Sequence, residues 1–298
     1  MNKKSIPELD KLFQEIGTYK ETTEFKKLLD FIKKFPRIAP YNAMLLHIQK
    51  PGSNYVTSAS DWLNRFGRMI KPGARPMVIL RPFGPVSFVF DLSDTEGKPF
   101  PDELLNPFGV VGKISNHEFQ MLIRNLKCDG IRYSEADYGT DMAGQIGASP
   151  SGKEVKVQKP TKEVWVKVLY DMVVNKNHKP EVQFATMLHE LGHLYCGHLG
   201  IPNLGDRLKF KWWEDRRGLG LNEREFEAKC VCWLVCERRG INNPSAAYLN
   251  GYLENNEHIP EISTDTILKA VAIIESMINE EKDPRKEIIN RVVELKKN

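Results

Sequence analysis

The sequence predicts an α+β fold with a small helical and β domain over residues 1–110, followed by a larger domain over residues 111–298. Three observations lead to this prediction. Segments with apolar residues at helical spacing precede two short strands in the first part. Proline, glycine and aspartate then crowd residues 93–115, as is typical of a boundary. In the second part several short strands lead into a long helix, which indicates a short mixed sheet beside one central helix.

Elements of the first domain follow from apolar spacing and from turn residues. We expect helices over residues 9–16, 23–35 and 41–49, the last of them stopped by Pro51-Gly52. Ser58 offers an N-cap to a further short helix that carries Trp62. Strands are expected over residues 77–80 and 86–92.

Elements of the second domain are predicted in the same way. Residues 147–152, Gly-Ala-Ser-Pro-Ser-Gly, have the residue types of a hairpin turn, and Pro180 suits the first turn of a helix. We expect helices over residues 117–126, 181–197, 222–239, 244–254 and 264–278, and a charged helix at the end of the chain. Strands are expected over residues 145–147 and 154–157, and from residue 164 through 175.

Composition argues for a protein of the cytoplasm. Hydrophobic residues make up 41% and charged residues 28%, and no apolar run is long enough to span a membrane. The N-terminus turns polar where a signal peptide needs its apolar stretch. Five cysteines without a regular framework suit a reducing compartment. Cys230, Cys232 and Cys236 share one apolar stretch, and we interpret them as small core residues rather than as a metal or redox site.

Charge is distributed unevenly along the chain. Residues 1–90 hold fifteen Lys and Arg against seven Asp and Glu, a net charge of +8, whereas the whole chain carries only +4. The remaining residues therefore sum to −4. A basic first third beside a mildly acidic remainder is a weak indication of a module that binds a polyanion.

The motif His189-Glu190-Leu191-Gly192-His193 predicts a zinc site on the long helix. Residues four apart lie on one face of a helix, so both imidazoles can reach one tetrahedral ion. Glu190, about 100° around the helix, can take a proton from a zinc-bound water without binding the metal. The alternative is a solvated helix surface, but the flanking residues are mostly apolar and would make these polar groups costly. Gly192 is explained if another element packs closely against it.

A third ligand has to come from another segment. Glu223, Glu225 and Glu227 lie at the start of the next predicted helix, and helical geometry alone does not choose between them. His198 is a further candidate, although a supporting or ordinary packed histidine fits its spacing better. Two tyrosines, Tyr170 and Tyr195, are candidate transition-state donors, with a place in the core as the simpler interpretation.

The second domain resembles the ImmA/IrrE-type metallopeptidases. The resemblance is carried by Phe184-x-x-x-Leu188-His189-Glu190-Leu191-Gly192-His193-Leu194 and by Glu225-x-x-Ala228. It implies a zincin-like fold with an active-site helix, and Glu225 as the third zinc ligand. The family often has Asn or Asp four residues after that glutamate, where this chain has Lys229.

The first domain resembles the single-stranded-DNA-binding domain of ArdC-type antirestriction proteins. The matching residues are Tyr41-Asn42-x-x-Leu45, Gln49-x-Pro51, Trp62, Gly67-Arg68-x-x-Lys71-x-Gly73, Pro82 and Phe90-Asp91-x-x-Asp94-Thr95, with a further match over residues 246–253. Single-stranded DNA needs cations for its phosphates and aromatic faces for its bases. Candidate DNA contacts are therefore Arg65, Arg68, Lys71, Arg75, Trp62 and Tyr41, with Arg68 and Lys71 expected to be exposed; the alternative places the aromatic residues in the core.

Two functional hypotheses follow. In the first, the chain is a DNA-associated zinc metallopeptidase that hydrolyses a peptide bond in a protein partner, such as a repressor or another regulator. In the second, it is an ArdC-like antirestriction protein that binds single-stranded DNA and uses zinc mainly for structure. Glu190 favours the first, because a structural site needs the ligands but not this base. The basic first domain favours the second.

Overall fold

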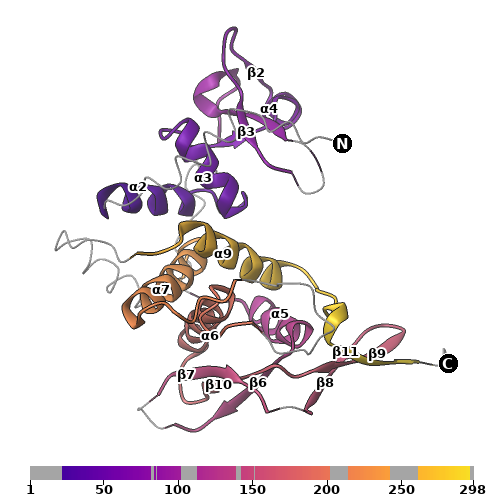
Figure 1. Cartoon of the computed structure of the whole chain (residues 1–298). Helices are drawn as coiled ribbons and strands as arrows, with labels where there is room; N and C mark the ends of the chain where they lie inside the picture. The colour runs from indigo at the N-terminus through magenta and orange to yellow at the C-terminus, as the bar shows by residue number, and fades with distance from the viewer. Residues whose placement is uncertain are drawn as a thin grey trace, which may run out of the picture. The chain divides into compact units, whose positions relative to one another are not determined.

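The computed structural model describes residues 22–81, 84, 86–101, 113–138, 142–150, 152–201, 214–241 and 261–295. By their contacts these residues form two compact units (Figure 1). The first unit takes the described residues up to 101 together with residues 237–240, and the second takes the others. Helices and small sheets occur in the chain together, so the predicted α+β class is confirmed. The helices expected over residues 9–16 and 244–254 lie outside the described residues.

Helices precede small antiparallel sheets in the first unit, as the sequence predicts. In chain order the elements are α2 (Thr22–Lys33), α3 (Pro40–Gln49), β1 (Val56–Thr57), α4 (Ala59–Phe66), β2 (Arg68–Ile70), β3 (Met77–Ile79), β4 (Ser87–Asp91), the 3-10 turn η2 (Leu92–Asp94) and β5 (Thr95–Gly97). Strand β4 lies between β1 and β3, and β2 pairs with β5. The expected cap is present, since the Ser58 hydroxyl accepts a hydrogen bond from the Asp61 N–H at 3.2 Å.

Two amide side chains of α3 cover the edge of the first unit's three-stranded sheet. Asn42 donates to the Leu80 carbonyl and accepts from the Leu80 N–H, both at 2.9 Å. Gln49 makes the same pair of bonds to Val78, both at 2.8 Å. The side chains thus satisfy backbone groups that a neighbouring strand would otherwise satisfy. Both residues belong to the ArdC-like pattern, which is explained at these positions by the fold itself.

In the described part of the second unit, one helix is followed by a run of strands, then by further helices and a final strand. In chain order the elements are α5 (Asn116–Leu126), the 3-10 turn η4 (Lys127–Asp129), β6 (Ile131–Ala136), β7 (Gly144–Ala148), β8 (Glu154–Gln158), β9 (Lys162–Lys167), β10 (Tyr170–Asn175), α6 (Pro180–Tyr195), α7 (Leu221–Glu237), α9 (Thr264–Asn279), the 3-10 turn η5 (Lys286–Ile288) and β11 (Ile289–Glu294). The last residue of α7 is counted with the first unit by its contacts.

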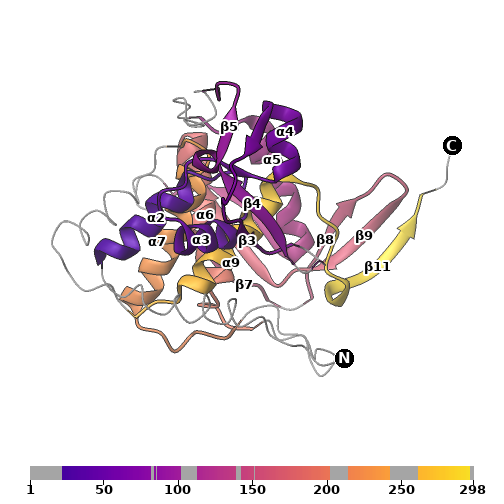
Figure 2. The ribbon, with the colours of Figure 1, turned by 90° about the horizontal axis from the view of Figure 1, so that it is seen from above.

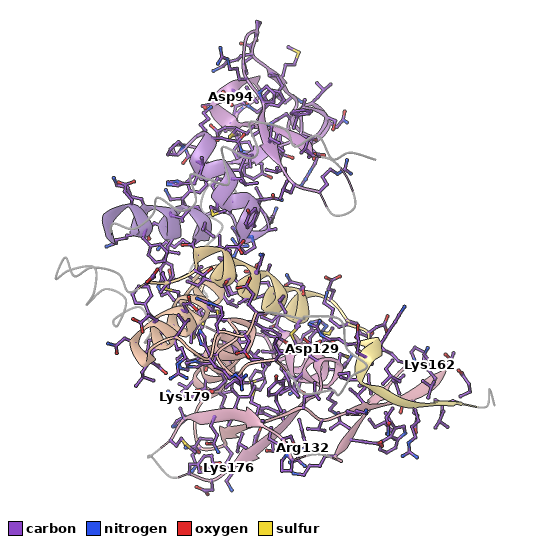
Figure 3. All side chains as sticks on the ribbon, viewed as in Figure 1. Asp94, Asp129, Arg132, Lys162, Lys176 and Lys179 are labelled. Carbon is purple, nitrogen blue, oxygen red and sulfur yellow. The ribbon has the colours of Figure 1, made fainter. Side chains whose placement is uncertain are left out.

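A mixed sheet supports the helices of the second unit. Strand β10 lies at its centre, parallel to β6 and antiparallel to β7, which confirms the predicted mixed pairing. Helices α5 and α6 pack on one face of the sheet, and α9 packs against both of them (Figure 1). Arg132 of β6 lies on the other side of the sheet, where its Nε donates to Asp171 at 2.7 Å (Figure 3). The long helix α6 is therefore held between sheet and helix.

Three predictions for this unit are wrong. The single strand expected over residues 164–175 is two strands, because the chain leaves β9 at Lys167 and enters a different sheet with β10. The strands on either side of the hairpin expected at residues 147–152 do not pair with each other, since β7 pairs with β10 and β8 pairs with β9. The charged segment at the end forms β11 instead of a helix, adding to the β8–β9 sheet (Figure 2). Pairing with β9 and burial of Ile288 against Val166 outweigh the local helical pattern.

All five cysteines are free thiols in the core of the structure. Cys230, Cys232 and Cys236 lie on the buried side of α7, each at most 1% exposed, which confirms their interpretation as core residues. In the part of the chain that the structure describes, no helix combines the length and the apolar character needed to cross a membrane.

Candidate metal centre

The motif helix α6 begins and ends as its sequence requires. Pro180 stands in the first turn, where its missing N–H costs no hydrogen bond. At the other end Gly197 adopts φ +81°, which favours glycine. The His198 N–H donates to the His193 carbonyl and the Gly197 N–H to the Leu194 carbonyl, both at 3.0 Å, which is the Schellman pattern. This turn folds His198 back beneath His193.

Helix α7 packs against α6 at the glycine of the motif. A Cβ atom on Gly192 would lie 2.9 Å from the Ala228 Cα and 3.0 Å from its carbonyl oxygen, closer than side chains pack. The close neighbour that we expected from Gly192 is therefore the backbone of α7. Because the two helices approach so closely here, a side chain on the first turns of α7 can reach the histidines of α6.

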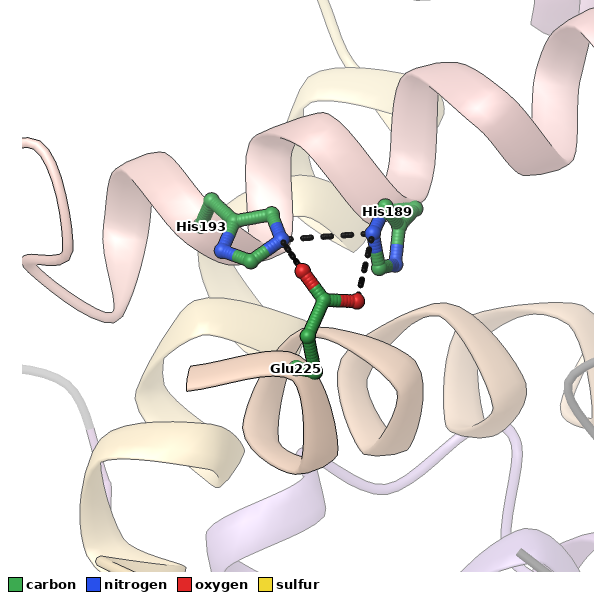
Figure 4. Close-up of side chains that lie close together, drawn as sticks. All are labelled: His189, His193 and Glu225. Atoms are coloured by element: carbon green, nitrogen blue, oxygen red, sulfur yellow. Dashed lines mark hydrogen bonds and ion pairs between the residues drawn. The ribbon is translucent and has the colours of Figure 1, made fainter. Parts of the chain in front are cut away.

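Three side chains from α6 and α7 converge on one point (Figure 4). The Nε2 atoms of His189 and His193 lie 3.2 Å apart. The two carboxylate oxygens of Glu225 lie 3.2 Å from Nε2 of His193 and 3.6 Å from Nε2 of His189. Two nitrogens and a carboxylate oxygen thus face one another without a hydrocarbon group between them.

The spacing of these donors fits a tetrahedral ion. Zinc bonds to nitrogen and oxygen are about 2.0–2.2 Å long, so that ligand atoms around a tetrahedral zinc are about 3.3 Å apart. The two Nε2 atoms, 3.2 Å apart, lie close to that value, and each of them has a different oxygen of Glu225 at a similar distance, 3.2 Å for His193 and 3.6 Å for His189. Two histidines and one carboxylate also form the donor set that catalytic zinc sites use when a fourth position stays open.

Electrostatics keeps both histidines neutral, as metal ligands must be. Burial lowers the pKa of His193 to about 3, with further lowering by the neighbouring His189 and His198. Burial also lowers the pKa of His189, against the opposing effect of the Glu225 charge. A neutral imidazole has one nitrogen with a free lone pair, so each ring can offer a ligand atom at neutral pH.

Glu190 lies beside the edge strand of the sheet. Its Oε2 accepts a hydrogen bond from the Ile146 N–H at 3.0 Å. Burial raises the pKa of Glu190 to about 7, helped by the charge of Glu225 and opposed by this hydrogen bond. A carboxyl group in this range can both accept and return a proton near neutral pH.

Strand β7 turns part of its backbone toward Glu190. Just outside its two ends, the Ser149 N–H donates to the Leu169 carbonyl and the Ala143 carbonyl accepts from the Asn175 N–H. Since bonding alternates along an antiparallel pair, Gly144, Ile146 and Ala148 point their backbone groups the other way. Among the described residues no strand pairs with this outer edge.

The other candidate ligands of α7 lie elsewhere. Glu227 is fully buried and is bound through both oxygens by Arg216 and by His198, whose Nε2 lies 2.9 Å from Oε2. Burial alone would raise the pKa of Glu227, but the hydrogen bonds from His198, Arg216 and the Ser263 N–H hold it below its usual range. A carboxylate oxygen of Glu223 lies close to Gly220 instead. Neither residue joins the group formed by His189, His193 and Glu225.

Lys229, the departure from the ImmA/IrrE pattern, places its Nζ 3.9 Å from Glu225.

The two candidate transition-state tyrosines are core residues. Tyr195 is 2% exposed and donates to Asp129 at 2.8 Å, and Tyr170 is 3% exposed. The simpler interpretation of both tyrosines therefore holds.

Several residues that were predicted to contact DNA make contacts within the first unit instead. Trp62 is 0% exposed, its Nε1 donates to the Phe90 carbonyl, and Tyr55, Phe66 and Phe100 surround its ring. The prediction that Trp62 offers a face to a base is therefore wrong. Its aromatic neighbours form a packed cluster, which composition alone does not distinguish from a stacking surface.

Arg68 and Lys71 differ from the expectation in another way. The Arg68 guanidinium donates to Thr95 and to the Lys98 carbonyl, and is half-buried. Lys71 is exposed, but its Nζ donates to the Ser93 carbonyl at 2.9 Å. Both cations thus fasten the segment around β5, which leaves fewer of their donors for a phosphate.

The remaining predicted contacts are more accessible. Arg65 and Arg75 are exposed, and the half-buried Tyr41 lies on α3. An aromatic residue that the prediction missed is Phe88 of β4, which is 56% exposed. Its signal was the alternation along residues 87–91, where Val89 and Asp91 are buried and Phe88 takes an outward position.

Comparison of the chain with protein-family models, with curated proteins and with solved structures gives no match. What the chain does must therefore be inferred from its own geometry.

Proposed function

We propose that the chain is a zinc-dependent metallopeptidase that hydrolyses a peptide bond in a protein partner. The observation that supports it best is the convergence of His189, His193 and Glu225, together with a further carboxylate, Glu190, on the helix that carries the two histidines. A structural metal site has no need of such a carboxylate. The resemblance to ImmA/IrrE-type metallopeptidases, which rests on the same residues, points in the same direction.

In this proposal His189, His193 and Glu225 would bind the zinc, and Glu190 would act as the general base and general acid. When bound by these residues, zinc would supply Lewis acidity toward the scissile carbonyl and toward water near neutral pH. Glu190 accepts the proton of the attacking water and returns it to the leaving amine. The hydrogen bond from Ile146 orients one oxygen of Glu190 and leaves the other for this transfer.

An extended peptide fits the outer edge of β7. The outward backbone groups of Gly144 and Ala148, together with the carbonyl of Ile146, can pair with a substrate segment in the manner of an added strand. Because the Ile146 N–H lies 3.0 Å from Glu190, a peptide aligned there would pass beside the proposed base. Such recognition uses main-chain atoms, so it suits a protein substrate in an extended conformation.

Metal analysis tests the ligand assignment directly. We expect one zinc ion per purified chain, and a fall in zinc affinity of more than about 100-fold in Glu225→Ala and in His189→Ala. Losing a supporting hydrogen bond to a ligand already costs about 10–100-fold, and losing the ligand costs more. Glu223→Ala, two residues away on α7, is the matched control and should keep its zinc. Full zinc retention in Glu225→Ala would show that another residue is the third ligand.

A second activity, binding of single-stranded DNA by the first unit, is favoured by one observation. Phe88, Arg65 and Arg75 are all exposed, and all three belong to the segment of residues 1–90 that carries a net charge of +8. Aromatic faces and cations together are what sequence-tolerant binding of single strands requires. We therefore propose a DNA-associated peptidase and place the DNA contacts on these residues.

The salt dependence of binding distinguishes a phosphate contact by Arg75 from base stacking on Phe88. In fluorescence anisotropy with a labelled oligonucleotide, Arg75→Ala should flatten the slope of log affinity against log salt by about 0.7. Phe88→Ala should weaken affinity by about 1–3 kcal/mol with little change of slope. Lys27→Ala, which removes a cation already paired with Glu24 at 2.7 Å, serves as the control. An absence of binding at low salt would contradict this part of the proposal and leave the peptidase untouched.

A further inference from the structure

A series of buried hydrogen bonds leads away from the candidate metal centre within the second unit. Nδ1 of His193 lies 3.0 Å from Nδ1 of His198, and Nε2 of His198 lies 2.9 Å from Oε2 of Glu227. We call the series His193–His198–Glu227 the relay. The side chains of His198 and Glu227 are 1% and 0% exposed, so solvent does not compete for these bonds. The opposite nitrogen of His193, Nε2, faces His189 and Glu225.

The far end of the relay is fixed as a charged carboxylate. Arg216 donates to both oxygens of Glu227 through Nη1 and Nη2, and the Ser263 N–H donates to Oε1 at 2.8 Å. Arginine stays protonated at any pH at which the protein is folded, which keeps its partner ionised. An ionised carboxylate only accepts hydrogen bonds. The atom of His198 that faces Glu227 must therefore be a donor.

For imidazole rings that each carry one proton, this requirement determines the proton positions along the relay. If Nε2 of His198 carries the proton that it donates to Glu227, Nδ1 of the same neutral ring has only a lone pair. Nδ1 of His193 must then carry the proton that it donates to His198. The remaining nitrogen of His193, Nε2, is left with a lone pair directed at the metal centre. The opposite arrangement would set the lone pair of His198 against the charge of Glu227.

We propose that His198 and Glu227 are positioning residues, which hold His193 in the tautomer whose Nε2 can bind a metal ion. The proposal rests on the proposed function in taking His193 as a ligand. Metal-binding histidines generally need a partner for their second nitrogen, and that partner fixes the ring and its tautomer. Here the partner is a second histidine, brought into place by the Schellman turn at Gly197.

A different role for the same residues is disfavoured. Cys196, His198 and Glu227 also lie close enough together to hold a metal ion of their own. However, Arg216 already neutralises Glu227, and burial raises the pKa of the Cys196 thiol well above its usual range, which opposes formation of the thiolate ligand. The hydrogen-bonded series explains the contacts of His198 and Glu227 without a second ion.

Proton positions can be read on the metal-free full-length chain. With ¹⁵N-labelled histidine, long-range ¹H–¹⁵N NMR spectra distinguish a protonated Nδ1 from a protonated Nε2. At neutral pH we expect His193 to be protonated at Nδ1 and His198 at Nε2. A proton on Nε2 of His193, or on Nδ1 of His198, would overturn the proposal. This measurement needs no variant to fold, except the substitutions that assign the two signals.

Zinc affinity, measured by competition with a chromogenic chelator, provides the second readout. We expect His198→Phe to weaken zinc binding by about 10–100-fold, the usual effect of removing the partner of a ligand histidine. His198→Asn keeps an acceptor near the position of Nδ1 and should recover part of the loss, whereas a packing role would not distinguish the acceptor. Cys196→Ala, in the same buried cluster, is the matched control and should bind zinc as the wild type does.

The outcomes separate this proposal from the proposed function. A folded His198→Phe variant with wild-type zinc affinity would overturn the relay and leave the zinc site standing. Loss of one zinc equivalent in Cys196→Ala would overturn it in favour of a second metal site. A wild-type chain that binds no zinc would contradict the proposed function, while the tautomers of the metal-free chain would still decide the relay.

Discussion

Glu190→Gln should lower peptide hydrolysis by about 10²–10⁴-fold while the chain keeps its fold and its zinc, since this is the usual effect of removing a general base. The amide has nearly the shape of the carboxylate, and its oxygen can still accept the Ile146 N–H. It cannot accept a proton from water. Cleavage of an unfolded probe protein such as casein, followed by mass spectrometry with zinc content measured in parallel, gives the comparison.

Two outcomes would contradict this expectation. Hydrolysis by Glu190→Gln at the wild-type rate would remove Glu190 as the base. A zinc-loaded wild-type chain that cleaves neither the probe nor an added protein partner would favour the alternative in which zinc serves structure. His193→Ala, which removes a proposed ligand, should lose both zinc and hydrolysis and so differs from Glu190→Gln.

Gly192→Leu should destabilise the second unit by at least about 3 kcal/mol, at or beyond the upper end of what overpacking usually costs. The added side chain would meet the backbone of Ala228, with its first atom already 2.9 Å from the Ala228 Cα. A backbone does not move aside as a flexible side chain does. The two helices would have to separate, and Glu225 would move away from the histidines of α6.

Thermal unfolding of the metal-free chain, followed by circular dichroism, measures this effect, and zinc affinity should fall with it. Gly218→Leu is the matched control, because a Cβ atom at Gly218 meets nothing within 4 Å and its φ is not in the left-handed region. An unchanged unfolding temperature in Gly192→Leu would mean that α6 and α7 separate at little cost, and that their contact does not set the geometry of the centre.

Sequence periodicity was sufficient for the half of the candidate metal centre that lies on one helix. Residues four apart share a helix face whatever the helix packs against, so His189 and His193 could be paired without a structure. The choice among Glu223, Glu225 and Glu227 depends on how α7 is rotated about its axis. That rotation follows from the contact of Gly192 with Ala228, which involves two segments far apart in the sequence. The resemblance to a family, and not the geometry, singled out Glu225.

The features that the sequence predicts wrongly, such as β11 and the burial of Trp62, depend on contacts between segments far apart in the chain. The final segment forms β11 because it finds β9, which lies more than a hundred residues earlier. Trp62 and Phe88 are both aromatic residues of a basic region, yet one is 0% and the other 56% exposed. Burial of an aromatic ring depends on its neighbours in space, whereas composition and local spacing report only on neighbours in sequence.

Because every cysteine is buried, the thiols can react only when the structure unfolds locally or globally. Burial raises the pKa of the Cys128 thiol to about 11, and it also raises the pKa of the Cys196 and Cys230 thiols well above their usual range. Oxidants and alkylating reagents act on exposed thiolates, which the closed structure does not offer. Their rate of reaction therefore reports how often the core opens. Zinc that binds only the closed form makes that opening rarer. Loading with metal would in this way protect the chain from oxidation, although no cysteine is among the proposed ligands.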